Sequence, residues 1–447
     1  MSSGDTIVAQ STPYGYSGIG VVRMSGSEST KIFKKISRIK KKLTSRIANK
    51  AYIYKKGDKI DEVMVVWYKA PKSYTGEDVI EISCHGNQYI VESIIEECIK
   101  GGAVAAGPGE FTKRAFQNGK IDLIQAESIA NTISTSSSVG LFNAISGVSG
   151  NMSKSIRETK NKIIKLLSYC EHLLDVSEVD IQNDNKKHTT KEITKISKKL
   201  AELTENYDTC RVLTYGAKIV LAGKTNSGKS TLFNVLVGEN RSIISKSPGT
   251  TRDYIDARIS LSGVPILLID TAGIRQSNDS IEALGVEKSK ELIKDADLVC
   301  YMTDITDKNS SEVPDNIELM DDRVIYIYNK VDLINLKDKR KTGDNSIYIS
   351  ALNKTGISKI KSSILKKLNV DNVPDKLVGV STPRQFQCIN NCLVSLKNVS
   401  DILSVGFELE LMCFELNEAL ESINDLLGEN TEETVLNNMF ESFCVGK

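Results

Sequence analysis

The sequence predicts a multidomain protein of α/β and all-α parts, in which an α/β domain with a phosphate loop interrupts a set of long helices. Three observations carry this prediction. A phosphate-loop motif follows an apolar strand, helical periodicity appears on both sides of that motif, and the first 120 residues carry short strand signals instead. A chain of 447 residues is too long for a single core and suits two or three domains.

The phosphate-loop motif occupies residues 223–230 and has the form G-x-x-x-x-G-K-[ST]. It follows the strand candidate Lys218–Ala222 and opens into a helix candidate. Its glycines allow backbone N–H groups to close around phosphates, and the helix N-terminus adds a partial positive charge. Lys229 is expected at the β- and γ-phosphates and Ser230 at Mg²⁺. The predicted nucleotide contacts here are Gly223, Asn226, Ser227, Gly228, Lys229, Ser230 and Thr231, and the alternative is a plain Gly/Ser turn.

Guanine is the base that the next signal favours. The N-K-x-D run of Asn329, Lys330 and Asp332 follows the strand candidate Val324–Tyr328. A carboxylate at Asp332 can accept from the N1–H and the 2-amino group of guanine. Adenine offers neither donor and would leave the carboxylate desolvated and unpaired.

Two further elements complete the predicted GTP site. Asp270 and Gly273 belong to a D-T-A-G run that follows an apolar strand, where they suit water-mediated Mg²⁺ binding and a γ-phosphate contact. Ser350 and Ala351 follow the last strand candidate and would pack on the base. All four elements come at the C-terminal ends of strands, where open parallel sheets bind ligands, so we expect GTP and Mg²⁺ as cofactors.

The domain boundaries follow from these patterns. We predict an N-terminal α/β domain at 1–120, helices at 121–211, the GTPase domain at 212–372 and further helices at 373–447. The two helical sets would form one discontinuous domain, because each needs a partner for its apolar face; two independent helical domains are the alternative. A polar break is expected at Ser177–Thr190.

In the first domain the strand candidates are Thr6–Gln10, Gly20–Met24, Ala51–Tyr54, Glu62–Tyr68 and Asp78–Ser83, with a hairpin turn at Lys56–Lys59 and a helix at Tyr89–Ile99.

The composition limits the functional classes. The formal net charge is +1, so the chain has no global basic field and an RNA contact would need a local patch. No apolar run is long enough to cross a membrane. The nine cysteines are scattered and only three histidines occur, which disfavours a zinc site and favours reduced, buried cysteines. We therefore expect a cytoplasmic protein.

Several further segments resemble the sequence signatures of a single protein family. They are Asp5–Gln10, Gly18–Gly26, Ser73–Asp78, Cys84–Asn87, Pro108–Phe116 and the tail Phe443–Lys447. With the central GTPase signals they resemble, over the whole length, the tRNA-modifying GTPases known as MnmE or TrmE. The first loop, Pro13–Gly18, departs from that family's glycine- and proline-rich pattern, because Tyr14 and Tyr16 appear and an arginine is lost.

The resemblance implies a reaction and its partners. With an FAD-dependent partner subunit, in a heterotetramer, the family adds an aminomethyl-type group to C5 of the wobble uridine (U34) of certain tRNAs. FAD belongs to the partner, and a tetrahydrofolate derivative, in the 5-formyl or methylene form, supplies the carbon. The resemblance implies that the N-terminal domain, 1–120, binds this folate and dimerises. Arg23, Glu81, Lys120 and Lys447 match the folate contacts, although ordinary strand alternation also explains Glu81. Cys444 is either a reactive thiol or a packed tail residue.

The resemblance also implies how GTP is hydrolysed. No glutamine follows Gly273, and the family instead holds K⁺ at the asparagine matched by Asn226, inside a homodimer of GTPase domains. Without the resemblance, a loop-stabilising side chain is the alternative for Asn226, and Glu282 reads as one more exposed helix charge. The implied roles are K⁺ binding by Asn226, Ser245, Ser247 and Thr250, Mg²⁺ binding by Ser230 and Thr251, and catalysis by Asn226, Arg252, Glu282 and Cys444.

Other readings of the GTPase signals remain. A regulatory GTPase of ribosome assembly would act as a binding switch, but such proteins often carry an RNA-binding module where this chain has an acidic helical segment. A scaffold that uses GTP only to dimerise is a further alternative. An iron-transport GTPase is disfavoured because no membrane span is expected.

Overall fold

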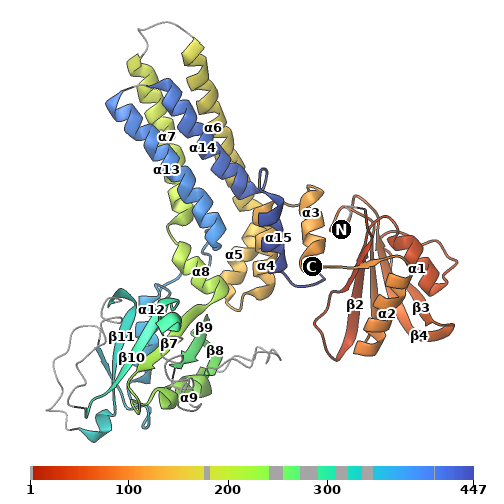
Figure 1. The fold of residues 1–447 in the computed structure, drawn as a ribbon, viewed down its shortest axis with the longest axis horizontal. Coiled ribbons are helices and arrows are strands. Elements are labelled where there is room, and N and C mark those ends of the chain that lie inside the picture. Colours follow the sequence, from red (N-terminus) through yellow and green to blue (C-terminus); the bar gives the residue numbers. More distant parts are fainter. Residues whose placement is uncertain are drawn as a thin grey trace. The chain divides into compact units, whose positions relative to one another are not determined.

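The computed structural model describes residues 4–175, 182–240, 255–271, 290–307, 321–334, 346–406 and 408–446 (Figure 1). The chain divides into two compact units. The first comprises Met1–Ala130, Gly147–Ile193 and Cys388–Lys447, and the second Asn131–Ser146 and Thr194–Gln387. Each unit contains one sheet, and the predicted GTP-binding signals all belong to the second.

The sheet of the first unit has six strands in the order β3-β4-β5-β2-β1-β6. Neighbours pair antiparallel except β1 and β6, which are parallel. The strands are β1 Ile7–Gln10, β2 Ser17–Ser25, β3 Asn49–Lys55, β4 Asp58–Tyr68, β5 Val79–Gly86 and β6 Val104–Ala105. The predicted hairpin turn is confirmed between β3 and β4, since Lys56 and Gly57 have φ values of 51° and 103°, the left-handed geometry of a tight two-residue turn.

Helices α1 (Ser29–Ser37) and α2 (Gln88–Lys100) cover one face of this sheet (Figure 1). Apolar residues of α1 such as Ile32 and Phe33 join a buried core with the inward-facing residues of the strands, among them Ile53 and Ile82. The alternation of buried and exposed residues along β3 and β4 leaves the opposite strand positions for polar and aromatic side chains. Helix α3 (Glu110–Gln117) follows β6.

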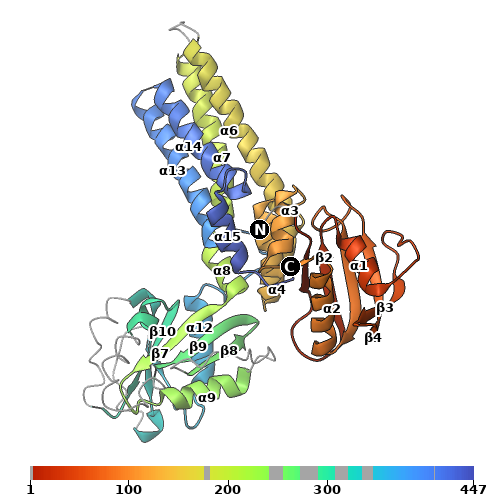
Figure 2. The ribbon, with the colours of Figure 1, turned by 45° about the vertical axis from the view of Figure 1, so that its right-hand side comes forward.

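Long helices make up the rest of the first unit and extend into the second. They are α4 Leu123–Ser134, α5 Ser138–Val148, α6 Asn151–Asp175, α7 Gln182–Thr204, α8 Tyr207–Tyr215, α13 Pro383–Val405, α14 Leu409–Leu427 and α15 Glu433–Glu441. Helices α6 and α14 lie side by side in both views (Figures 1 and 2) and bury apolar faces that include Ile163 and Leu416. Because α6 precedes the GTPase signals and α14 follows them, the helical domain is discontinuous, and the alternative of two independent helical domains is wrong.

The predicted polar break between α6 and α7 is wrong in its second half. Residues from Gln182 onward are helical, whereas the break was expected to reach Thr190. The segment contains no glycine or proline that would end a helix. Thr189 is fully buried, so this mostly polar helix packs one side against the protein. None of the described helices combines the length and the apolar character that a membrane crossing requires.

The sheet of the second unit also has six strands, in the order β12-β11-β10-β7-β9-β8. All neighbours are parallel except β8 and β9. The strands are β7 Ala217–Gly223, β8 Ile255–Leu261, β9 Val264–Asp270, β10 Leu298–Asp304, β11 Val324–Asn329 and β12 Ser346–Tyr348, with α9 at Lys229–Asn240 and α12 at Ile357–Lys367. Successive β7 residues enter different buried clusters on the two faces, as a strand covered on both sides requires.

Candidate functional site

The predicted nucleotide residues meet at one edge of the second sheet. Strand β7 lies between β9 and β10: the chain places β8 and β9 on one side of β7 and then crosses to place β10, β11 and β12 on the other, so the strand order reverses at β7. The phosphate loop follows β7, while Asp270, Asp304 and Asn329 end β9, β10 and β11. A ligand site is expected at such a reversal of strand order, and the structure places the loop there.

Both glycines of the phosphate loop are required by their surroundings. Gly223 has φ 137°, and a Cβ there would lie 2.0 Å from the Met302 carbonyl oxygen. Gly228 has φ 98°, and its Cβ would lie 2.1 Å from the Asn329 amide nitrogen. Any side chain at either position would push the loop away from β10 or from Asn329. Asn226 also has a positive φ, 57°, and its side chain is exposed.

Lys229 and Ser230 place a cation and a hydroxyl at the start of α9. The buried Lys229 ammonium donates to the carbonyl oxygens of Gly223 and Lys224, at 2.9 and 2.8 Å, so the loop curves around it. The Ser230 hydroxyl donates to the Asp270 carboxylate at 2.7 Å. A hydroxyl and a carboxylate side by side are the hard oxygen ligands that Mg²⁺ prefers, directly or through water. The residues present therefore fit a Mg²⁺–nucleotide.

The base-recognition segment is tied to the phosphate loop by Asn329. Its buried side-chain amide donates to the Ser227 carbonyl at 2.8 Å and accepts from the Ala351 N–H at 2.9 Å. Asn329 therefore holds together the two loops that the sequence assigned to phosphate and base. Ser350 beside it is buried, and its hydroxyl accepts from the Asn353 N–H at 3.2 Å.

Asp332 and Lys330 complete this side of the site. The Asp332 side chain is exposed and so available to a base. The Lys330 ammonium lies 2.5 Å from the Asp304 carboxylate. Burial opposes the ionised form of Asp304, but hydrogen bonds from Lys330 and then Thr306 outweigh it and hold the pKa of Asp304 below its ordinary value. The ion pair keeps the Lys330 stem next to the phosphate-loop side of β10.

Eight of the predicted site residues lie outside the described residues. They are Ser245, Ser247, Thr250, Thr251, Arg252, Gly273, Glu282 and Lys447. The roles assigned to them stay predictions.

A second cluster lies in the first unit and includes residues that the sequence assigned to folate. The Arg23 guanidinium donates to the Glu81 carboxylate through Nε at 2.9 Å and Nη2 at 2.8 Å, across the β2–β5 pair. The guanidinium also lies 5.7 Å from the ring centroids of Tyr74 and Phe111. Strand alternation alone did not single out Glu81, but the structure pairs it with Arg23 in a partly buried position.

The C-terminal tail joins this cluster. Arg23 Nη1 donates to the Gly446 carbonyl at 3.3 Å, and the Ser11 hydroxyl donates to the same oxygen at 3.1 Å. Val445 forms an antiparallel bridge with Pro108. Residues far apart in sequence thus meet around one arginine.

Cys444, in the same tail, is the exposed thiol among the cysteines, all of which are described and free. Burial raises the pKa of other thiols, to about 12 for Cys300.

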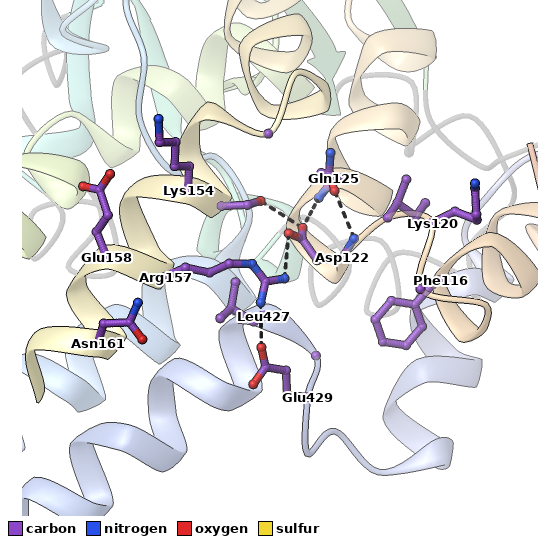
Figure 3. Close-up of a pocket in the computed structure, with 15 residues that line it drawn as sticks. Phe116, Lys120, Asp122, Gln125, Lys154, Arg157, Glu158, Asn161, Leu427 and Glu429 are labelled. Atoms are coloured by element: carbon purple, nitrogen blue, oxygen red, sulfur yellow. Dashed lines mark hydrogen bonds and ion pairs between the residues drawn. The ribbon is translucent and has the colours of Figure 1, made fainter. Parts of the chain in front are cut away.

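Lys120, the other folate candidate that the structure describes, is hydrogen-bonded to a different segment. Its ammonium donates to the Pro71 carbonyl at 3.0 Å, and within the described chain it makes no hydrogen bond to Arg23 or Glu81. Lys120 borders a pocket of about 600 Å³ where α4, α6 and the end of α14 meet. Figure 3 shows the Arg157 side chain in this pocket, lying between the carboxylates of Asp122 and Glu429.

A buried ion-pair network next to the cluster was missed by the sequence reasoning. Arg114 donates to Glu110 at 2.9 Å, to Glu77 at 3.2 Å and to the Asp5 carbonyl at 2.7 Å. The Ser25 hydroxyl donates to Glu77 at 2.7 Å. The i, i+4 spacing of Glu110 and Arg114 was a visible signal, but the partners on other segments had none.

The sheet order, the phosphate loop and the guanine-type segment define a P-loop GTP-binding protein with an added N-terminal α/β domain. Two family models match the chain: "GTP-binding protein TrmE N-terminus" over residues 6–120 and "MnmE helical domain" over residues 123–444. The chain therefore belongs to the MnmE family of tRNA modification GTPases.

Individual relatives agree over nearly the whole length. The tRNA modification GTPase MnmE of Aquifex aeolicus is 36% identical over 99% of this chain and 100% of that protein. The protein of the same name from Acetivibrio thermocellus is 35% identical over 99% of each chain. That of Francisella tularensis subsp. novicida is 37% identical over 100% of each.

Proposed function

We propose that this chain hydrolyses GTP in a K⁺-stimulated reaction. We further propose that, with an FAD-dependent partner subunit, it adds an aminomethyl or carboxymethylaminomethyl group to C5 of the wobble uridine of certain tRNAs. The relatives named above as tRNA modification GTPases support the substrate class. The observation that carries the modifying role is the Arg23–Glu81 pair joined to the C-terminal tail, because a GTP switch has no need of it.

The nucleotide-binding half of the function rests on the phosphate loop. Lys229 and the backbone N–H groups of the loop would hold the phosphates, Ser230 and Asp270 would hold Mg²⁺, and Asp332 would read guanine. A K⁺ at Asn226 would supply positive charge between the β- and γ-phosphates. The exposed side chain of Asn226, on a loop held by Gly223 and Gly228, is available for that role.

The carbon-donor half rests on the cluster in the first unit. A carboxylate such as Glu81 can accept from the N–H edge of a pterin, and arginine or lysine can hold the glutamate tail of a folate. Arg23 orients the Glu81 carboxylate through two nitrogens, while its third nitrogen holds the tail that carries Cys444. When bound, the folate would supply the one-carbon unit. We place this chemistry in a cytoplasmic assembly of two copies of this chain with the partner subunit.

Nucleoside analysis of tRNA tests the modifying role. A strain that lacks this chain should lose the wobble-uridine modification, and a plasmid copy should restore it. An unchanged nucleoside profile would instead favour a regulatory GTPase of ribosome assembly. Reconstitution with the FAD-dependent partner, in which K⁺ and folate are varied separately, then assigns each requirement.

The K⁺ role is tested in the isolated chain. Asn226→Ala should lose the stimulation of GTP hydrolysis by K⁺ while it keeps GDP binding. Asn353→Ala, at an exposed asparagine of the same unit, is the matched control and should keep both. Equal hydrolysis rates of the unaltered chain in Na⁺ and K⁺ at matched ionic strength would contradict the proposal.

A further inference from the structure

The positive charge of this chain is concentrated in one segment. Residues 29–57 contain eleven lysines and arginines and no aspartate or glutamate. The whole chain has 58 basic and 57 acidic residues, so outside this segment acidic residues are in excess. The segment runs from α1 through the following loop and β3 to the β-hairpin turn. A near-neutral chain therefore carries a strongly basic segment within its N-terminal domain.

Most lysines of this segment are exposed and have no acidic partner among the described residues. Helix α1 buries Ile32, Phe33 and Ile36 in the core, which turns its lysines outward. Six exposed lysines form no ion pair within the described chain: Lys34, Lys35, Lys40, Lys41, Lys42 and Lys56. Other basic residues of the segment do have partners, as in the Lys55–Glu96 pair at 2.8 Å. Exposed lysines in excess over their acidic partners favour a polyanionic ligand.

Exposed tyrosines border the basic segment on α2. The Tyr89 side chain is 69% exposed, and the Lys55 ammonium lies 5.4 Å from its ring centroid. The unusual first loop adds Tyr14 and Tyr16, which are 79% and 89% exposed. That loop lies on α2, because the Gly15 N–H donates to Gln88 at 3.4 Å. Exposed aromatic rings such as these can stack on unpaired bases.

The tyrosine loop leads directly to the Arg23 cluster. It begins after Gln10 and Ser11, and the Ser11 hydroxyl donates to the Gly446 carbonyl that also accepts from Arg23. Gln88 of α2 donates to the Gln10 side chain at 3.4 Å. In series, the basic segment meets Tyr89 through Lys55, the tyrosine loop meets α2 through Gln88, and the start of that loop meets the Arg23 cluster through Ser11.

We propose that this series is an RNA-binding surface, in which the basic segment 29–57 holds phosphates and Tyr14, Tyr16 and Tyr89 stack on unpaired bases next to the Arg23 cluster. The inference rests on the proposed function, because the RNA is the tRNA whose wobble base is modified. Anionic lipid is a poorer fit, since the apolar side chains of α1 are buried in the core and cannot insert into a bilayer.

The phosphate contacts are tested by removing the loop charges. The triple variant Lys40→Ala, Lys41→Ala and Lys42→Ala is compared with the triple variant Lys359→Ala, Lys366→Ala and Lys397→Ala, which removes the same charge at exposed lysines elsewhere. Binding of fluorescent tRNA is measured at several salt concentrations. The loop variant should bind roughly tenfold more weakly or worse, with a shallower salt dependence, because about two to three phosphate contacts are lost. The control should bind like the unaltered chain, and equal effects of both variants would overturn the surface.

The stacking contacts are tested separately. The double variant Tyr14→Leu and Tyr16→Leu should weaken tRNA binding on the order of tenfold without changing its salt dependence, because stacking involves no phosphate. The double variant Tyr14→Phe and Tyr16→Phe keeps both rings and should keep the affinity. If the leucine variant binds as the phenylalanine variant does, the tyrosines are not stacking residues.

Two outcomes separate this inference from the proposed function. If tRNA nucleosides are unchanged in the deletion strain but the lysine variant loses tRNA binding, the modifying role fails and the surface stands. If the nucleosides change but the lysine variant binds tRNA normally, the surface fails alone. Loss of binding to phosphatidylserine vesicles by a variant that keeps its tRNA affinity would assign the surface to lipid. GTP hydrolysis by each variant reports that the protein is folded.

Discussion

Asn329 is the residue on which the geometry of the nucleotide site depends. One buried amide satisfies the Ser227 carbonyl of the phosphate loop and the Ala351 N–H of the base-side loop. The N-K-x-D pattern predicted a residue near the base, but its contact with the phosphate loop is a tertiary contact between segments about a hundred residues apart, which no local pattern contains.

Asn329→Ala should therefore disturb stability and binding together. The substitution leaves a buried carbonyl and a buried N–H unpaired, at a cost of about 1–3 kcal/mol for each group. We expect a lower melting temperature and a GDP affinity reduced by roughly tenfold or more, since about 1.4 kcal/mol corresponds to a factor of ten. Thermal unfolding and GDP titration measure the two effects. Asn353→Ala, which removes an exposed side chain, should change neither; a normal GDP affinity in Asn329→Ala would contradict the bridging role.

At the scale of elements, the C-terminal tail depends on a single glycine. Gly446 has φ +89°, and a Cβ there would lie 2.1 Å from the Gln10 carbonyl oxygen. The backbone of β1 cannot yield to such a clash, so the tail of Gly446→Ala should leave the Arg23 cluster.

Carboxypeptidase digestion measures this release, and the variant should be shortened faster than the unaltered chain. Gly102→Ala is the matched control, because Gly102 also has a positive φ, 116°, but a Cβ there would meet nothing within 4 Å. Its left-handed conformation costs about 1–2 kcal/mol without a clash, so its tail should stay in place. Equal digestion rates for both glycine variants would show that the tail does not need Gly446.

The junction of α4, α6 and α14 depends on a small charge network. Glu429, just after α14, accepts from Arg157 at 2.8 Å and from Lys160, while Arg157 also contacts Asp122 at 3.3 Å. Burial opposes the charge on Glu429, but the hydrogen bond and charge of Lys160, and then those of Arg157, hold its pKa below the ordinary value of 4.5. The network therefore stabilises the charged form of Glu429 in the folded state.

The lowered pKa of Glu429 sets a pH window. Its contribution is fully present above pH 4.5 and is lost as the pH falls through the lowered folded-state value. Glu429→Gln should therefore reduce the free energy of unfolding by about 1 kcal/mol or less at neutral pH, since the pair is partly exposed, and by nothing in strong acid. Urea unfolding at both pH values measures this difference. Glu421→Gln, at an exposed site of α14, should show no such loss at neutral pH, and a loss equal to that of Glu429→Gln would exclude the network as its cause.

The sequence predicted local structure well, but it did not predict which residues of distant segments contact one another. The β3–β4 hairpin, the strand before each nucleotide motif and the two glycines of the phosphate loop follow from periodicity and backbone geometry within a few residues. The pairing of Arg23 with Glu81 and the bond from Arg23 to Gly446 join segments that no local rule connects. The family resemblance predicted Arg23 and Glu81 at one ligand, and the structure shows which of their atoms meet and adds Gly446.

For the whole molecule, the open question is whether one copy of the chain completes its own GTPase site. Asn226 is exposed, and among the described residues of the phosphate loop none other than Lys229 places a positive charge inside the loop. A K⁺ held at such an open position needs a wall that excludes water before its charge has full effect. We therefore propose that a second copy supplies this wall, in agreement with the proposed homodimer.

If two copies form the active site, the rate of GTP hydrolysis per chain in K⁺ should rise with protein concentration and level off once the chain is dimeric. In Na⁺ the rate should stay low at every concentration. Asn226→Ala should give low, concentration-independent rates in both salts, whereas Asn353→Ala should behave as the unaltered chain. Sedimentation is measured with GDP and aluminium fluoride, which mimics the transferring phosphate, on the full chain and on the isolated residues 212–372. Dimers are expected in K⁺, and the isolated GTPase units should be monomeric in Na⁺. A rate per chain that does not depend on concentration, in a protein that sediments as a monomer with K⁺ and the analogue, would show that one copy suffices.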